Sequence, residues 1–251
     1  MTQRELQIKS TLDESLQPSL FYGAESTEKK PLLVGLHTWG ANRFNHVDRM
    51  VPYAEKYNFN LLLPEFRGSN RVENPNCTKA CGSIYAKQDI IDAVDYCVAN
   101  ENVDADNVFL LGPSGGGHMA LLLAGYRPEY FKAIGAFVGI TDLKRWSEEN
   151  LNYSEHIFAC CSNDEEEMEK RSPMNYIDTI AKSNLKIFHG KSDPSVPVSH
   201  SIRLFNEINE KYPKARVYLD IFDGGHTIDM DQAFYWFMSQ YNRVEKENVT
   251  G

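Results

Sequence analysis

Short apolar runs alternate with segments of helical periodicity along most of this chain. The runs are rich in Leu, Ile, Val and Phe, as in strands buried on both faces of a parallel sheet. They cover residues 32–36, 59–63, 108–111, 133–138, 185–188 and 216–222. Apolar residues recur with helical spacing at residues 45–57, 84–99, 116–125, 198–212 and 232–241. Residues 5–9 and 19–22 instead alternate polar and apolar positions, which predicts an antiparallel pair around a turn.

This order of elements predicts an α/β fold with about eight mostly parallel strands and helices on both faces of the sheet. The chain has 251 residues with neither an internal repeat nor a low-complexity linker, so we expect a single domain over residues 1–251. The longest connection lies between the sixth and seventh strands, and we expect it to form a small lid at about residues 142–183. Within it, the acidic run 163–171 (NDEEEMEKR) predicts a solvent-exposed helix.

Composition and charge narrow the classes of function. Hydrophobic residues make up 42% and charged residues 24%, which is typical of a globular protein and excludes a disordered or fibrous one. A net charge of −9 repels phosphate backbones and anionic lipid, so we expect neither nucleic-acid nor membrane binding. No apolar run is long enough for a bilayer, and the first residues lack the apolar region of a signal peptide. We therefore expect a cytoplasmic protein, or an exported one if a signal peptide has been removed.

The cysteines do not indicate a disulfide framework, because five is an odd number in a chain of ordinary size. Cys77 and Cys81 lie in a predicted loop and could close a small disulfide in an exported protein. No second Cys or His pair with ligand spacing accompanies them, so we expect no metal site. The adjacent Cys160 and Cys161 are interpreted as apolar packing beneath the lid.

The strongest chemical signal is the segment Gly112-Pro113-Ser114-Gly115-Gly116, between an apolar strand and an apolar helix. A nucleophilic serine on such a sharp strand-to-helix turn needs small residues two positions away on either side. The alternative is a glycine-rich phosphate loop, but the G-x-x-x-x-G-K-[S/T] spacing is missing. Ser114 is therefore the candidate nucleophile.

A serine hydroxyl becomes a good nucleophile only when a base takes its proton, and the base needs a carboxylate to orient it. His226 follows the last predicted strand in a glycine-flanked loop, and Asp193 follows the seventh strand. Such positions meet at the edge where open α/β sheets bind ligands. Asp223 is the second candidate acid, whereas Asp229 and Asp231 are interpreted as capping residues of the next helix.

With these motifs the chain resembles the α/β-hydrolase superfamily, most closely the catalytic domain of the prolyl-oligopeptidase family and its small esterase relatives. The matching segments are residues 66–69 (FRGS), 89–96 (DIIDAVDY), 103–117, 172–176 (SPMNY), 189–197 (HGKSDPSVP) and 225–226. The resemblance implies a cofactor-free serine hydrolase that forms an acyl-enzyme on Ser114. Its substrate would be a small ester or a short peptide.

Several features depart from the peptidases of this family. Glycine follows Ser114 where those enzymes usually carry a bulkier residue, and the 251 residues contain neither a propeller nor a paired-glutamate segment for a substrate amine. These departures favour a small carboxylesterase of acetyl or feruloyl type. A third possibility is a non-catalytic binding protein on the same fold.

The resemblance also implies an oxyanion hole made of two backbone N–H groups. Gly115 supplies one. The segment His37-Thr38-Trp39-Gly40 is similar to the H-G-x segment of the family, and Trp39 is expected to supply the other. The Trp39 indole either floors the acyl pocket or only packs, and the same two interpretations apply to three lid aromatics, Trp146, Tyr153 and Phe158. The remaining histidines, His37, His118 and His189 among them, are interpreted as structural.

Overall fold

The computed structural model describes residues 1–241 and contains one eight-stranded sheet in the order β1-β2-β4-β3-β5-β6-β7-β8. The first two strands form an antiparallel hairpin whose second strand pairs antiparallel with β4, and all later pairs are parallel. The strands are β1 (Thr2–Lys9), β2 (Leu16–Gly23), β3 (Lys30–Gly35), β4 (Asn60–Pro64), β5 (Val103–Pro113), β6 (Ala133–Phe137), β7 (Leu185–Gly190) and β8 (Val217–Phe222). The predicted hairpin and mostly parallel sheet are confirmed.

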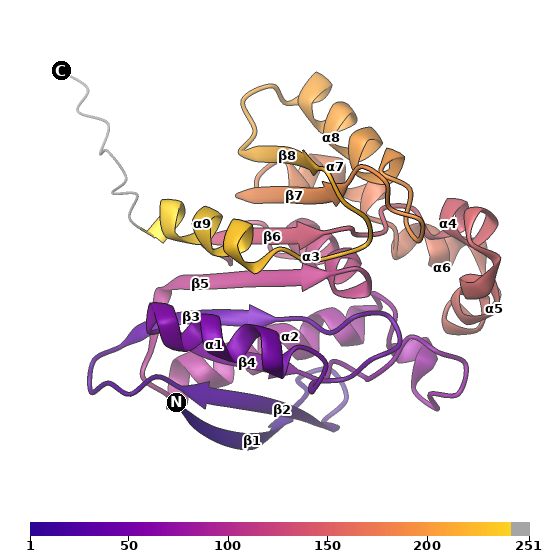
Figure 1. Cartoon of the computed structure of the whole chain (residues 1–251). Coiled ribbons are helices and arrows are strands. Elements are labelled where there is room, and N and C mark those ends of the chain that lie inside the picture. The colour runs from indigo at the N-terminus through magenta and orange to yellow at the C-terminus, as the bar shows by residue number, and fades with distance from the viewer. Residues whose placement is uncertain (242–251) are drawn as a thin grey trace.

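Helices cover both faces of this sheet (Figure 1). One face packs against α1 (Val47–Tyr57) and α9 (Met230–Tyr241), and the other against α2 (Ile84–Asn100), α3 (Gly115–Tyr126) and α8 (Ser199–Lys211). Neighbouring strand residues point to opposite faces, so Leu32 and Val34 belong to one core cluster and Leu33 to the other. In the middle of the sheet, β4 and β6 are buried at every position and nearly all of their residues are apolar, because helices cover both faces.

The connection between β6 and β7 divides into two parts. Three short helices, α4 (Leu143–Glu149), α5 (Leu151–Cys160) and α6 (Glu165–Lys170), lie beyond the carboxyl ends of the parallel strands (Figure 1). The 3-10 turn η2 (Pro173–Tyr176) and α7 (Ile177–Ile180) pack instead against α3 in the main helical layer. The part that stands over the sheet edge is thus shorter than the range 142–183 taken from the sequence.

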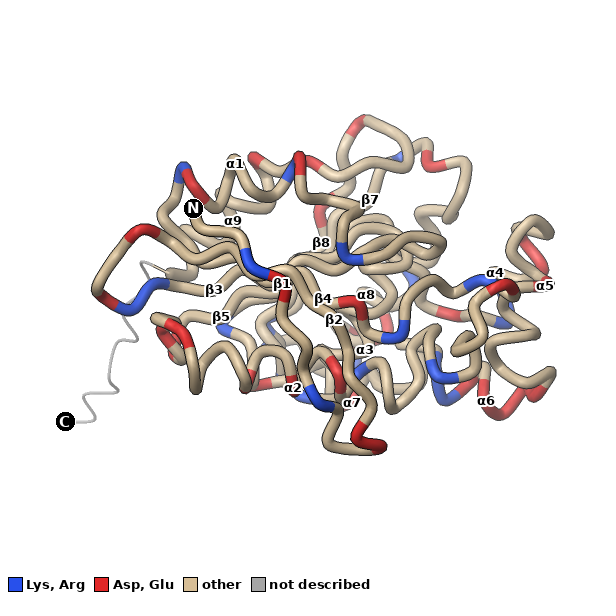
Figure 2. The backbone as a smooth tube through the Cα atoms, turned by 90° about the horizontal axis from the view of Figure 1, so that it is seen from below, with Lys and Arg blue, Asp and Glu red and all other residues tan. Residues whose placement is uncertain are grey.

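Charged positions are spread along the backbone, and acidic ones gather around α5 and α6 (Figure 2). In α6, Glu165, Glu166 and Glu167 occupy the first turn and Lys170 the last, as the acidic run predicts. Within residues 1–241, no helix combines the length and the apolar character needed to cross a membrane.

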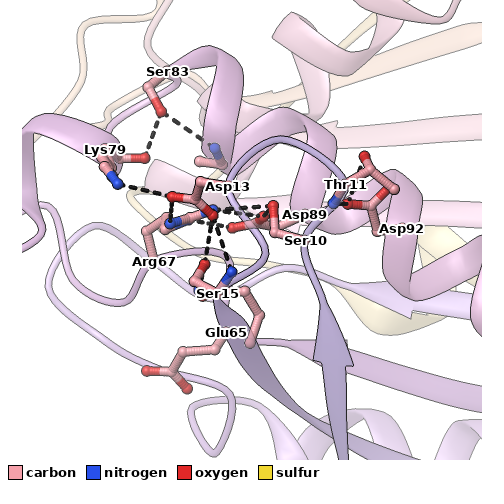
Figure 3. A network of polar contacts seen from close by, with 12 residues as sticks. Ser10, Thr11, Asp13, Ser15, Glu65, Arg67, Lys79, Ser83, Asp89 and Asp92 are labelled. Atoms are coloured by element: carbon pink, nitrogen blue, oxygen red, sulfur yellow. Dashed lines mark hydrogen bonds and ion pairs between the residues drawn. The ribbon is translucent and has the colours of Figure 1, made fainter.

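A buried ion-pair network fixes the loop that follows β4 (Figure 3). The Arg67 guanidinium donates to Asp89 of α2 at 2.5 Å and to Asp13 of the β1–β2 turn at 2.9 Å. Burial raises the pKa of Asp89, although Arg67 and Ser10 oppose that change. Hydrogen bonds from Arg67, Lys79 and Ser15 lower the pKa of Asp13 far below its usual range. The network holds the FRGS segment, which the sequence singled out, to two distant parts of the chain.

Candidate active site

Ser114 lies on a strained turn between β5 and α3. Its φ of 55° and ψ of −118° fall where side-chain-bearing residues rarely occur, and its N–H donates to the Phe137 carbonyl at 2.8 Å. A Cβ atom at Gly112 would overlap the Gly116 carbonyl, and one at Gly116 would lie 2.8 Å from the carbonyl oxygens of Leu36 and His37. The two glycines are therefore required for the turn that presents the serine hydroxyl.

The structure brings the three candidate catalytic side chains into one hydrogen-bonded row. Ser114 Oγ lies 2.9 Å from His226 Nε2, and His226 Nδ1 lies 2.8 Å from Asp193 Oδ2. Each residue follows the carboxyl end of a parallel strand, namely β5, β7 and β8. An ionised carboxylate only accepts hydrogen bonds, so Nδ1 carries the proton and Nε2 is free to accept the proton of the serine.

Asp193 is buried and held in its ionised form. Its Oδ1 accepts from the backbone N–H groups of Ser195 and Val196 at 2.8 and 3.0 Å, and His189 Nε2 lies 3.4 Å from its Oδ2. Burial alone raises the pKa of Asp193, but the contacts with His189, His226 and the two N–H groups outweigh burial and bring the pKa well below its ordinary value. The carboxylate therefore carries its charge throughout the neutral and mildly acidic range.

Two backbone N–H groups close to the serine have no acceptor among residues 1–241. The Thr38 N–H is already used, because it donates to Asn45 Oδ1 at 3.0 Å. The Trp39 N–H has no acceptor among residues 1–241, and Gly115 is the first residue of α3, whose N–H has no partner within the helix. A Cβ at residue 115 would lie 2.6 Å from the Trp39 Cα, so the two residues are in close backbone contact. This pair can hold a developing oxyanion.

A cavity of about 570 Å³ opens at the serine. Its lining includes Trp39 and Tyr153 together with Ser114 and His226, but Trp146 is not part of it. The Trp146 ring is buried behind Tyr153, stacked on it at 4.5 Å, and its Nε1 donates to the Ser195 carbonyl. The structure therefore does not bring Trp146 to the cavity as a substrate contact. Trp146 belongs to α4, and its ring packs between α5 and the loop that carries Asp193.

Three other histidines have structural surroundings. His37 bonds to two carbonyls and stacks on Phe66 at 3.9 Å, and His189 bonds to Ser201 and to the Val196 carbonyl. His118 Nε2 donates to the Arg171 carbonyl, and burial lowers its pKa to about 4.

Among residues 1–241, neither the cysteines nor other possible metal ligands form a second functional site. All five thiols are free, including Cys77 and Cys81. Over the described residues there is no group of three or more His, Cys, Asp or Glu side chains arranged to hold a metal ion.

Sequence reasoning missed several residues of this site. Asn45 accepts from the Thr38 N–H, His189 lies 3.4 Å from the Asp193 carboxylate, and Arg49 and Arg71 line the cavity. Only His189 had a usable signal, since it lies at the end of β7, four positions before Asp193. The other contacts join loops that are remote in the sequence.

Comparison with known proteins places this architecture in a family. The model of the prolyl oligopeptidase family matches residues 46–246. An acylamino-acid-releasing enzyme of Arabidopsis thaliana is 25% identical over 238 residues, which cover 88% of this chain and 31% of that enzyme. Feruloyl esterase B of Neurospora crassa is 31% identical over 118 residues, which cover 45% of this chain and 40% of the esterase. The chain thus spans about a third of the length of the first of these relatives.

A solved structure agrees with the fold. The acylaminoacyl peptidase of Pyrococcus horikoshii superposes with a TM-score of 0.75 at 19% identity, covering 100% of this chain and 43% of that one. At this identity the likeness establishes the α/β-hydrolase fold alone, while the family match covers most of the chain. The chain therefore belongs to the prolyl oligopeptidase family of serine hydrolases.

Proposed function

We propose that this protein cleaves a carboxylic ester or peptide bond through an acyl-enzyme formed on Ser114. The observation that carries the proposal is the continuous hydrogen-bonded row from Ser114 Oγ through His226 to Asp193. In the first step, the serine oxygen attacks the substrate carbonyl while its proton moves to His226 Nε2. Asp193 stabilises the imidazolium that forms, because its pKa is low and it stays ionised.

The later steps use the same groups. The tetrahedral oxyanion accepts hydrogen bonds from the N–H groups of Gly115 and Trp39. His226 then returns the proton to the leaving group, and the carbonyl–leaving group bond breaks to give the ester of Ser114. A water molecule attacks this ester as it gives a proton to His226. The bond between the acyl carbon and Ser114 Oγ then breaks, His226 returns the proton to Oγ, and the acid product leaves.

The names of the relatives suggest two kinds of substrate. The acylamino-acid-releasing enzymes suggest the amide bond that follows an N-acylated amino acid, and the feruloyl esterase suggests an ester. The second candidate function is therefore a small carboxylesterase without peptidase activity, in line with the glycine that follows Ser114.

The test compares kcat/KM for a short-chain aryl ester with that for N-acetylalanyl and alanyl anilides, using Ser114→Ala as the blank. Turnover of an anilide by the wild type but not by Ser114→Ala supports the peptidase assignment. Turnover of the ester alone makes the protein a carboxylesterase. A fluorophosphonate probe provides a second readout, since an activated serine is labelled in the wild type and not in Ser114→Ala. Failure of both turnover and labelling would identify a non-catalytic binding protein.

A further inference from the structure

Two arginines line the catalytic cavity without a carboxylate partner. Arg49 lies in the first turn of α1 and Arg71 in the loop after β4, and both border the space in front of Ser114. Among residues 1–241 neither guanidinium forms a salt bridge or a side-chain hydrogen bond. By contrast, Arg43 pairs with Glu65 and Glu5, and Arg145 pairs with Glu149. In a protein with 35 acidic residues against 26 basic ones, two unpaired arginines in one cavity call for a functional explanation.

The backbone that carries Arg71 is firmly held. The N–H of the preceding Asn70 donates to the Trp39 carbonyl at 2.7 Å, and the Asn70 side chain accepts from the Cys81 N–H at 2.7 Å. The Asn74 N–H donates to the Arg71 carbonyl at 2.9 Å. Arg67, four positions earlier, is anchored in the network of Figure 3. Arg71 therefore extends from a fixed point next to the oxyanion loop.

The Arg71 guanidinium itself lies against that loop. A Cβ atom at Gly40 would be 2.9 Å from its Nη2 and 3.0 Å from its Cζ. Gly40 directly follows Trp39, whose backbone in turn contacts Gly115 beside the nucleophile. This chain of contacts brings a permanent positive charge to the immediate neighbourhood of the reacting carbonyl.

The rest of the cavity leaves this positive charge largely uncompensated. Asp48 is the one acidic residue in the lining, against two arginines. His46 also lines the cavity, but burial lowers its pKa to about 4, so it is neutral at neutral pH. The N-terminal end of α1, which carries a partial positive charge, meets the same space through Asn45 and His46.

We propose that Arg49 and Arg71 bind a carboxylate of the substrate, so that the enzyme prefers esters or short peptides with a free carboxylate to their neutral counterparts. The inference rests on the hydrolase function proposed above and specifies its substrate class. Guanidinium groups match carboxylates through paired, charge-assisted hydrogen bonds. A carboxylate is the anion that a small ester or peptide substrate carries, either on its acyl part or on its leaving group. Because the protein as a whole repels anions, local arginines are needed to retain such a substrate.

Matched ester pairs test this preference. For the leaving group, 4-acetoxybenzoate is compared with its methyl ester. For the acyl part, the monoaryl ester of adipic acid is compared with the aryl methyl adipate. The ratio of kcat/KM for the charged to the neutral member is measured in the wild type, in Arg49→Gln, in Arg71→Gln and in the double variant. The change of this ratio between proteins is informative, because intrinsic reactivity cancels.

We expect the ratio in one of the two pairs to fall on the order of ten-fold in each single variant and further in the double variant, as the loss of a charge-assisted hydrogen bond implies. The pair that responds identifies the part of the substrate that carries the carboxylate. Arg127→Gln is the matched control, since Arg127 is exposed at the far end of α3 and its loss changes the net charge equally. Its ratio should stay at the wild-type value.

Several outcomes would overturn the inference. If ester hydrolysis depends on Ser114 but no arginine variant moves either ratio, the carboxylate site is wrong and the hydrolase function stands. An equal fall in Arg127→Gln would attribute the effect to net charge. A wild type that hydrolyses none of the four esters and takes no fluorophosphonate label would overturn the function and the inference together. Both arginines are exposed, so their replacement leaves folding intact, and circular dichroism of each variant checks this.

Discussion

The backbone of Trp39 lies so close to Gly115 that a methyl group on residue 115 would be 2.6 Å from the Trp39 Cα. These are the two residues whose N–H groups we propose as the oxyanion donors, and the glycine allows their backbones to lie this close. The glycine at this position is one of the departures from the family that the sequence shows. Its local cause is the Trp39 backbone, which occupies the space that a side chain would need.

Gly115→Ala is therefore expected to lower kcat by 10²-fold or more, because the oxyanion loop must move away and one donor is lost. The measurement is aryl ester hydrolysis together with the thermal unfolding midpoint. Gly23→Ala is the control, since a Cβ there would meet its nearest neighbour at an ordinary 3.4 Å. An active Gly115→Ala protein would show that Trp39 is not an oxyanion donor.

Stability should decline in mild acid because buried histidines stay neutral in the folded state. Burial lowers the pKa of His118 from 6.5 to about 4, so between these values the unfolded chain binds a proton that the folded chain does not. The stabilisation is complete above pH 6.5 and is lost as the pH falls toward 4, by about 3 kcal/mol for this group.

Urea unfolding at several pH values measures this decline. In His118→Gln the free energy of unfolding should fall less steeply with decreasing pH than in the wild type. It should still fall, because burial also lowers the pKa of His46 to about 4. An unchanged slope would contradict the assignment to His118.

Removing Arg67 should destabilise the protein strongly. Its side chain is 3% exposed and pairs with Asp89, which is 1% exposed, so Arg67→Met leaves a buried carboxylate without its partner. We expect a loss of about 3–5 kcal/mol in the free energy of unfolding. Arg203→Met removes exposed ion pairs with Glu207 and Asp142 and should cost less than about 1 kcal/mol. Equal losses in the two variants would refute the role of the network.

The thiols should react in two classes. Cys77 is partly exposed, while Cys81, Cys97, Cys160 and Cys161 are buried. Titration with an aromatic disulfide reagent is expected to detect one reactive thiol in the native protein and all five after unfolding without reductant. A count of three after unfolding would mean that two cysteines are joined, with Cys77 and Cys81 as the first pair to examine.

Much of the fold follows from local sequence pattern. Strands that are buried on both faces are nearly all apolar, which made them recognisable, and glycines marked the turns around Ser114 and His226. The strand β5 begins at Val103, before the apolar run from which it was predicted. Its first part contains exposed polar residues such as Asp106, so the apolar pattern did not reveal where it starts. The ends of elements are set by pairing with neighbours, which the local pattern does not contain.

The sequence likewise predicted some residues of the candidate site and not others. Ser114, Asp193 and His226 could be proposed because each follows a strand, and parallel strands end at one edge of the sheet. The choice between Trp146 and Tyr153 as a cavity residue could not be made, because it depends on how α4 and α5 pack on the Asp193 loop. The meeting of Arg71 with Gly40 joins two loops that no periodicity connects.

The hydrogen bond between Ser114 and His226 joins residues that are 112 positions apart, across strands that are not neighbours in the chain. Helices can form from local contacts, but this bond exists only when β5, β7 and β8 are aligned in the finished sheet. During refolding from denaturant, helical circular dichroism should thus return before the reactivity of the serine. A proteolytic nick or a destabilised edge that loosens β8 would silence the enzyme while most of its secondary structure persists.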